Sequence, residues 1–209
     1  LDAVLARSFA DLHTLRSSID GQKYYAAGVP WFATLFGRDA AMTAIEMLAD
    51  EPRVAEHTAR LLAHYQARDT SEWRDEQPGK ILHSIRVVEM ARLHSIPHTP
   101  YYGTVDATPL FLILIGAHAA WTGDLSLFQQ LLPNVELALA WMTGNADSNG
   151  DGYIDYLSTS EHGLINQGWK DSGDAIVTAQ GRLATPPIAL VEVQGYAYLA
   201  RSLMAGLYE

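Results

Sequence analysis

Cysteine is absent from this 209-residue chain, and its absence removes three kinds of chemistry at once. Disulfide bonds, thiol nucleophiles and thiolate metal sites all need cysteine. A chain without disulfides suits the cytoplasm, so we expect a cytoplasmic protein.

Basic residues are also scarce. Lysine and arginine together number 14 against 24 acidic residues, which gives a formal net charge of -10. No basic cluster interrupts this excess, so a polyanion such as nucleic acid would be repelled, and a neutral or cationic ligand is favoured. The most apolar run, residues 109–121, is too short to cross a membrane, and no leader-like segment precedes it, so we expect no membrane partner.

Alternating polarity and β-branched runs with hairpin turns are missing as well, which favours an all-α class. The abrupt first and last residues suggest a piece of a larger domain. Apolar residues recur at helical spacing in several stretches, and Pro133 is expected to divide one of them. The last stretch is apolar on nearly all sides, which predicts a buried helix. The expected helices span residues 5–19, 42–49, 54–65, 84–94, 106–121 and 125–131, followed by a longer helix that starts with residues 134–141 and a last one over residues 188–207.

Three long connections, residues 20–37, 70–83 and 146–187, separate these helices. Connections of that length in a helical protein are usually functional or misassigned. They are rich in glycine, aromatic and acidic residues. Aromatic rings stack on the apolar faces of sugars while carboxylates hold hydroxyl groups, so this composition suits a carbohydrate ligand.

Two acidic positions lie at expected helix starts. The stretch GVPWFATLFGRDA carries Trp31 and leads to the pair Arg38 and Asp39, which can grip neighbouring sugar hydroxyls. Tyr102 similarly precedes Asp106. Helix capping, with a local salt bridge in the first case, explains both equally well at this stage.

The richest polar segment is INQGWKDSGD. Here Asp171 follows Trp169 and Lys170, and partial shielding from water beside a tryptophan would raise the pKa of a carboxyl group towards the range of a general acid. The alternatives are that Lys170 pairs with a nearby acid or that Asp171 and Asp174 cap a turn.

A third acidic segment, DSNGDGYIDY, matches the opening of a calcium loop through Asp147, Asn149 and Asp151. The match fails at Ser158, the twelfth position, where an EF-hand has glutamate. A structural calcium completed from elsewhere and an ion-free Asx turn therefore remain open, and no other cofactor is expected.

The last helical stretch places Glu192 and Gln194 in its first turns. Charged residues are rarely buried without a partner, so these two either face a cavity or form core hydrogen bonds. The eight histidines form no HExxH pair, and neither a phosphate-binding glycine loop nor a G-x-S-x-G elbow occurs, so zinc, nucleotide and serine-hydrolase chemistry are not predicted.

Taken in order, seven segments resemble the bacterial amylo-alpha-1,6-glucosidase (glycogen debranching) family. They are GVPWFATLFGRDA, QPGKILHSIR, HTPYYGTVDATPLF, WTGDLSLFQQLLPNVELALAW, DSNGDGYIDY, GLINQGWKDSGDAI and PIALVEVQGYAY. The resemblance implies an (α/α)6 toroid of which residues 1–209 form a part, about the first seven or eight helices. The remainder of the same domain is then a partner of this chain.

The resemblance further implies inverting hydrolysis of α-glucosidic bonds in a neutral oligosaccharide, with Asp171 as the general acid. Arg38 and Asp39 match the pair that holds the cleaved glucose, and Trp31, Tyr102, Asp106, Trp169, Lys170, Glu192 and Gln194 are further substrate-binding positions. Ser84 departs from the glutamate expected in relatives. The general base is expected beyond residue 209, which would leave this chain inactive alone. Two alternatives stay open: another hydrolase of the same barrel type acting on trehalose, sucrose or glycosylated small molecules, and a noncatalytic sugar-binding or calcium-responsive helical protein.

Overall fold

A computed structural model describes residues 1–86, 88–93 and 95–209. The described chain is mostly helical with a few short strands, in agreement with the expected all-α class. Its helices are α1 (Asp2–Leu15), α2 (Gly37–Glu46), α3 (Pro52–His64), α4 (Glu89–Arg92), α5 (Ala107–Thr122), α6 (Ser126–Thr143) and α7 (Val191–Tyr208). Its strands are β1 (Arg16–Ile19), β2 (Gln22–Tyr25), β3 (Asp155–Tyr156) and β4 (Ile188–Ala189).

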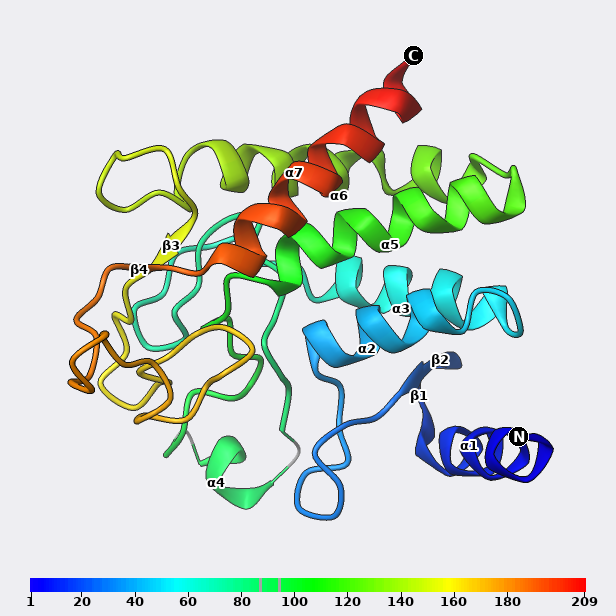
Figure 1. Ribbon diagram of the computed structural model, residues 1–209, viewed down its shortest axis with the longest axis horizontal. Helices are drawn as coiled ribbons and strands as arrows, with labels where there is room; N and C mark the ends of the chain where they lie inside the picture. Colours follow the sequence, from blue (N-terminus) through cyan, green and yellow to red (C-terminus); the bar gives the residue numbers. More distant parts are fainter. Residues whose placement is uncertain (87, 94) are drawn as a thin grey trace.

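The core is built around α5, which packs against α2, α3, α6 and α7. Nearly all of its side chains from Ala107 to Ala119 are buried, so this helix is covered on every side. Successive long helices run in alternating directions, and α2, α5 and α7 all begin at the end where the long loops gather, on the left of Figure 1. Side chains at the starts of these three helices are thereby brought to one end of the fold.

A close approach of two backbones fixes the start of α2. The amide N–H of Gly37 donates to the carbonyl oxygen of His83 at 3.0 Å. A Cβ atom at position 37 would lie only 2.1 Å from the carbonyl oxygen of Leu82, so no side chain fits there. The loop before α2 and the segment around residue 82 are therefore held in direct contact.

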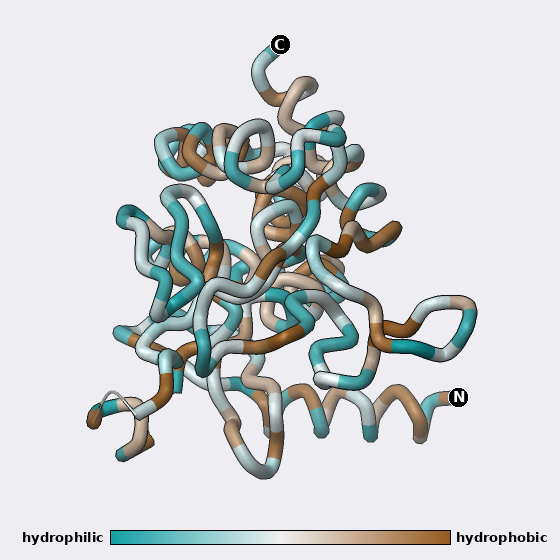
Figure 2. The backbone as a smooth tube through the Cα atoms, turned by 90° about the vertical axis from the view of Figure 1, so that its left-hand side faces the viewer, coloured by the Kyte–Doolittle hydropathy of each residue, from teal (hydrophilic) through white to brown (hydrophobic). Residues whose placement is uncertain are grey.

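Helix α1 lies apart from this body along the lower edge of Figure 2. Leu12 attaches it to a small cluster of Tyr25, Met47 and Val54. Val4, Leu5 and Phe9 are exposed, Leu15 is partly buried, and no residue of α1 is fully buried. The helix presents an apolar face that the described residues leave uncovered.

Several local expectations prove wrong. Residues 16–19 do not extend the first helix but pair with residues 22–25 in an antiparallel hairpin. Its two-residue turn, Asp20 and Gly21, has positive φ at both positions, which is the geometry that aspartate followed by glycine favours in tight hairpins. The Asp-Gly pair was the sequence signal for this turn.

The expected helix over residues 84–94 is also wrong for most of its length. Ser84 instead forms isolated bridges with Phe36 and Tyr101, and Arg86 N donates to the carbonyl oxygen of His98. The only helix in this stretch is the short α4, while positions 87 and 94 lie outside the described residues. Extended pairing with two neighbouring segments outweighs the local helical pattern.

Pro133 does not divide the helix in which it lies. Helix α6 continues through Pro133. The side-chain amide of the next residue, Asn134, donates to Gln66 Oε1 and to the carbonyl oxygen of Ala63, and these bonds hold α6 against the end of α3. Tertiary contacts thus maintain a helix that proline would locally disfavour. The side chain of Asp124 accepts hydrogen bonds from the backbone N–H and the hydroxyl of Ser126, the first residue of α6.

The last helix is shorter and less buried than expected. Residues 188–189 pair with β3, and α7 begins at Val191. Its buried residues, Val193, Ala197, Ala200 and Met204, form one stripe, while Val191, Tyr198 and Tyr208 are exposed. The prediction of a helix buried on all sides is therefore wrong for this chain. Among the described residues, no helix has both the length and the apolar character needed to cross a bilayer.

Candidate functional site

The buried guanidinium of Arg38 joins two segments that are distant in the sequence. Its Nη1 donates to Asp106 Oδ2 at 3.0 Å and to the carbonyl oxygen of Gly168 at 3.1 Å. Arg38 lies in the first turn of α2 and Asp106 immediately precedes α5, so the shared direction of the two helices brings them together. Thr104 Oγ1 donates to the other oxygen of Asp106 at 2.6 Å and fixes that carboxylate.

Two further carboxylates surround the same guanidinium at longer range. Asp39 Oδ2 lies 3.8 Å from Nε of Arg38, and Asp171 Oδ2 lies 3.9 Å from Nη2. The three predicted acidic residues, Asp39, Asp106 and Asp171, therefore meet around one arginine. Within the described residues, the buried Nε atom has no hydrogen-bond acceptor.

One side of this cluster opens to solvent. The guanidinium carbon of Arg38 lies 5.3 Å from the ring centroid of Trp169, whose side chain is 60% exposed. The side chain of Asp171 is 38% exposed, whereas that of Asp106 is almost fully buried. An exposed aromatic ring beside an accessible carboxylate is the arrangement that a sugar ring needs for stacking and hydrogen bonding.

The electrostatics of the cluster follow from one cation among three carboxylates. Burial alone would lower the pKa of Arg38, but the neighbouring Asp106 and Asp39 raise it, so this guanidinium stays charged. Burial raises the pKa of Asp39, and Arg38 opposes part of that rise. The excess of negative charge favours a neutral or cationic ligand over an anion.

Other predicted residues lie elsewhere. Tyr102 is buried in the core, where its hydroxyl donates to the carbonyl oxygen of Tyr65 at 2.8 Å. Gln194 forms a two-way amide pair with the backbone of Ile154, accepting at 3.0 Å and donating at 2.8 Å. Both side chains therefore have structural partners. For Gln194 this agrees with the alternative that it forms hydrogen bonds in the core. Trp31 is 84% exposed, and Lys170 is exposed too.

Glu192 lies half-buried in the first turn of α7, and Tyr196 follows one turn later on the same face. Burial raises the pKa of Tyr196, and the charges of Asp106 and Glu192 raise it further. Tyr196 is therefore a neighbour of the arginine cluster that the sequence reasoning did not select. The signal in the sequence was that Tyr196 lies four residues after Glu192, which places both side chains on the same face of the helix.

A second residue missed from sequence is Asp75, a buried carboxylate that holds the loop leading to Gly168. Its side chain accepts six hydrogen bonds, five of them from residues 158–167. The donors are Tyr101 Oη at 2.7 Å, Thr159 N at 2.7 Å, Thr159 Oγ1 at 2.8 Å, Ser160 N at 3.1 Å, Gln167 Nε2 at 3.1 Å and Ser158 Oγ at 3.3 Å. Nothing local in the sequence marks Asp75, because its partners lie 26 to 92 residues away.

We expect Asp75→Asn to destabilise the fold by about 2–4 kcal/mol, because an amide nitrogen would face groups that all donate. Urea unfolding measures this loss, and hydrogen exchange should rise first in residues 157–168. Asp174→Asn, at an exposed carboxylate of the same region, is the matched control. Equal stability of the two variants would show that the six contacts do not hold the loop.

The segment predicted as a calcium loop forms Asx turns. Asp147 accepts from the backbone N–H groups of Gly150, Asp151 and Gly152, at 2.7, 3.1 and 2.8 Å. Backbone hydrogen bonds, chiefly that from Gly152, lower the pKa of Asp147. In the part of the chain that the structure describes, no three His, Asp or Glu side chains are grouped to hold a metal ion. Calcium binding stays a prediction.

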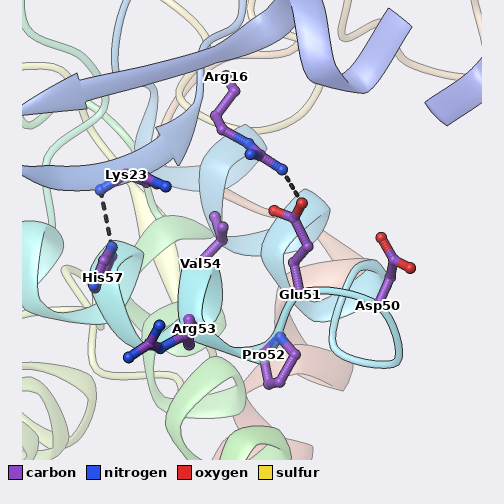
Figure 3. Close-up of a pocket in the computed structure, with 8 residues that line it drawn as sticks. All are labelled: Arg16, Lys23, Asp50, Glu51, Pro52, Arg53, Val54 and His57. Carbon is purple, nitrogen blue, oxygen red and sulfur yellow. Dashed lines mark hydrogen bonds and ion pairs between the residues drawn. The ribbon is translucent and has the colours of Figure 1, made fainter. Parts of the chain in front are cut away.

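A separate cavity of about 300 Å³ lies between the β1–β2 hairpin and the start of α3 (Figure 3). An ion pair between Arg16 and Glu51 borders it, and the backbone N–H of Lys23 donates to His57 Nδ1 at 3.2 Å. None of the predicted site residues lines this cavity. It is distinct from the cluster around Arg38.

Comparison with known proteins identifies no relative: no protein-family model matches the chain, and no curated protein matches it at a significant level.

Proposed function

We propose that this chain is part of an (α/α)6 glycoside hydrolase domain that cleaves α-glucosidic bonds with inversion, of the amylo-alpha-1,6-glucosidase type. The observation that carries the proposal is the meeting of Arg38, Asp39, Asp106 and Asp171 around one partly open site. The resemblance of seven ordered sequence segments to that family supports the same assignment. The proposal includes a cytoplasmic location, which a chain without cysteine suits.

In this proposal Asp171 is the general acid. Its half-exposed carboxyl group protonates the glycosidic oxygen, while a second carboxylate, about 6.5–9.5 Å away in an inverting enzyme, activates water on the opposite face of the sugar. We assign that second carboxylate to the remainder of the domain. Protonating the leaving oxygen avoids expulsion of an alkoxide and contributes roughly 10²–10⁴-fold to the rate.

The other members of the cluster bind the sugar. Asp39, which lies beside the guanidinium of Arg38, accepts from a sugar hydroxyl group. The exposed ring of Trp169 offers a stacking surface beside them. Asp106 holds Arg38 in place and keeps its buried charge compensated.

Two uncovered apolar faces support a larger helical ring. Helix α1 exposes Leu5 and Phe9, and α7 exposes Tyr198 and Leu199. The alternating directions of the long helices, with α2, α5 and α7 beginning at the site end, match the pattern of a toroid of helical hairpins (Figure 1). In the proposed domain, further helices cover both faces and close the ring.

The test is a substrate panel for the longer protein that contains this chain. It should release glucose from an α-1,6-linked oligosaccharide, and proton NMR should detect the β-anomer first, because inversion changes the anomeric configuration. Trehalose and sucrose in the same panel separate the debranching proposal from the related hydrolases. Failure to cleave any α-glucoside would contradict the proposal.

A further inference from the structure

Two adjoining cavities lie between the loop of residues 70–80 and the segment that follows β3, and the smaller one also borders the end of α6. Their volumes are about 120 and 190 Å³. They share Gln77, Lys80, Leu157 and Thr159, so Lys80 stands where the two spaces meet. None of the four charged residues of the Arg38 cluster lines either cavity.

Lys80 faces this space with unused hydrogen-bonding capacity. Its side chain is buried, and its Nζ donates to the carbonyl oxygen of Asp75 at 3.1 Å. An ammonium group carries three donors, and burying them without acceptors is costly. The nitrogen lies 5.8 Å from the ring centroid of Trp141, which gives it partial electrostatic compensation only.

Asp155 lines the smaller cavity, and its carboxylate has unused hydrogen-bond acceptor sites. Its buried carboxylate accepts from the backbone N–H of Ser148, at 3.2 and 3.3 Å to its two oxygens. A carboxylate offers about four acceptor sites, so most of them are open. Among the ion pairs of the described residues, none joins Asp155 to Lys80.

The other charged residues around the cavities are carboxylates. Glu76 forms an ion pair with Arg74, the side chain of Asp75 accepts its six hydrogen bonds, and Glu72, which lines the larger cavity, is exposed to solvent. Lys80 and Asp155 are therefore the two buried charged groups that still need partners. The negative charge of the surrounding carboxylates disfavours an anionic ligand.

The walls define the chemistry of the ligand further. Amide groups of Gln77, Asn145 and Gln167 and the hydroxyl of Thr159 line the smaller cavity, together with the aromatic rings of Trp141 and Tyr156. The indole N–H of Trp141 is already bonded to Gln77 Oε1 at 2.8 Å. Hydroxyl groups both donate and accept, so one molecule with several of them serves the ammonium and the carboxylate together.

We propose that these cavities bind a small neutral polyhydroxy compound, no larger than a monosaccharide, through hydroxyl groups that bridge the ammonium of Lys80 and the carboxylate of Asp155. This site is separate from the Arg38 cluster and does not depend on the proposed hydrolase activity.

Binding is expected to depend on pH through Lys80. Burial lowers the pKa of Lys80 to about 8, and the charge of Asp75 opposes part of this shift. The ammonium is present below that pH and loses its charge as the pH rises through it. Because the ligand accepts from the charged form, affinity falls above pH 8. Of the other groups facing the cavities, Glu72, Asp75, Glu76 and Asp155 are carboxylates, and burial raises the pKa of Tyr156 to about 12.

The chain contains only three lysines, Lys23, Lys80 and Lys170, and the other two are exposed. NMR of the chain labelled with ¹³C at the lysine Cε positions therefore reports on Lys80 directly. Glycerol and then glucose are the probes. We expect a saturable shift of the Lys80 signal alone and a rise in its pKa when either probe is bound.

Lys80→Met keeps the length of the side chain and removes a buried charge, so it should fold and lose at least about tenfold in affinity, measured by calorimetry. Lys23→Met is the matched control and should bind normally. The proposal is overturned if all three lysine signals move equally, which indicates a solvent effect, or if Lys80→Met binds the probes as tightly as Lys23→Met does.

Discussion

Asp171→Asn in the full-length protein should lower kcat on an α-1,6-linked oligosaccharide by roughly two to four orders of magnitude, because the amide cannot protonate the leaving oxygen. KM should change much less, since asparagine keeps the shape and hydrogen-bonding reach of the side chain. The alkaline limb of the pH profile of kcat/KM, which reports loss of the proton from the general acid, should disappear.

A substrate with a good leaving group distinguishes loss of the general acid from structural damage in the Asp171→Asn variant. α-Glucosyl fluoride needs little help from a proton, so its hydrolysis should be far less impaired than that of the oligosaccharide. Asp174→Asn, three residues further along and exposed, is the control and should remain active. Near-normal turnover of the oligosaccharide by Asp171→Asn would exclude this residue as the acid.

Arg38→Met should be the most destabilising change at the site, with a loss of about 3–5 kcal/mol in the free energy of unfolding. The substitution leaves the buried carboxylate of Asp106 without its charged partner at 3.0 Å. Urea unfolding at neutral pH measures the loss. Arg7→Met, in an exposed pair with Asp11, is the control and should change stability very little.

A double variant tests whether the broken ion pair causes this loss. Arg38→Met combined with Asp106→Asn should recover part of the stability, because no buried carboxylate is then left without a charged partner. Purely additive losses would show that the two residues are not energetically coupled.

The arginine cluster was accessible from sequence because its members share a recognisable context. Arg38, Asp39 and Asp106 lie at helix starts that follow aromatic or glycine-rich loops, and Asp171 lies in the most polar loop of the chain. Helices that alternate in direction place those starts at one end. Local pattern alone left capping open for each of these residues, and the family resemblance was what grouped them into one site.

Contacts across the chain explain what could not be predicted. Asp75 has an ordinary local sequence, and its importance comes from donors around residues 158–167. The family resemblance implied that Tyr102 binds substrate, and nothing near it in the sequence revealed that its hydroxyl donates to the carbonyl oxygen of Tyr65 inside the core. The extended residues around Ser84 pair with two other segments, neither of which the local helical pattern reveals.

The position of Arg38 depends on the close backbone contact at Gly37, the residue before it. Any β-carbon at position 37 would push the beginning of α2 away from the carbonyl of Leu82, and Arg38 is the next residue along that helix. A displacement of one ångström would break hydrogen bonds that are now 3.0 and 3.1 Å long. The absence of a side chain at residue 37 thus fixes the position from which the guanidinium of Arg38 forms its hydrogen bonds. A larger residue at position 37 would therefore disturb the ion pair of Arg38 with Asp106 as well as the local backbone.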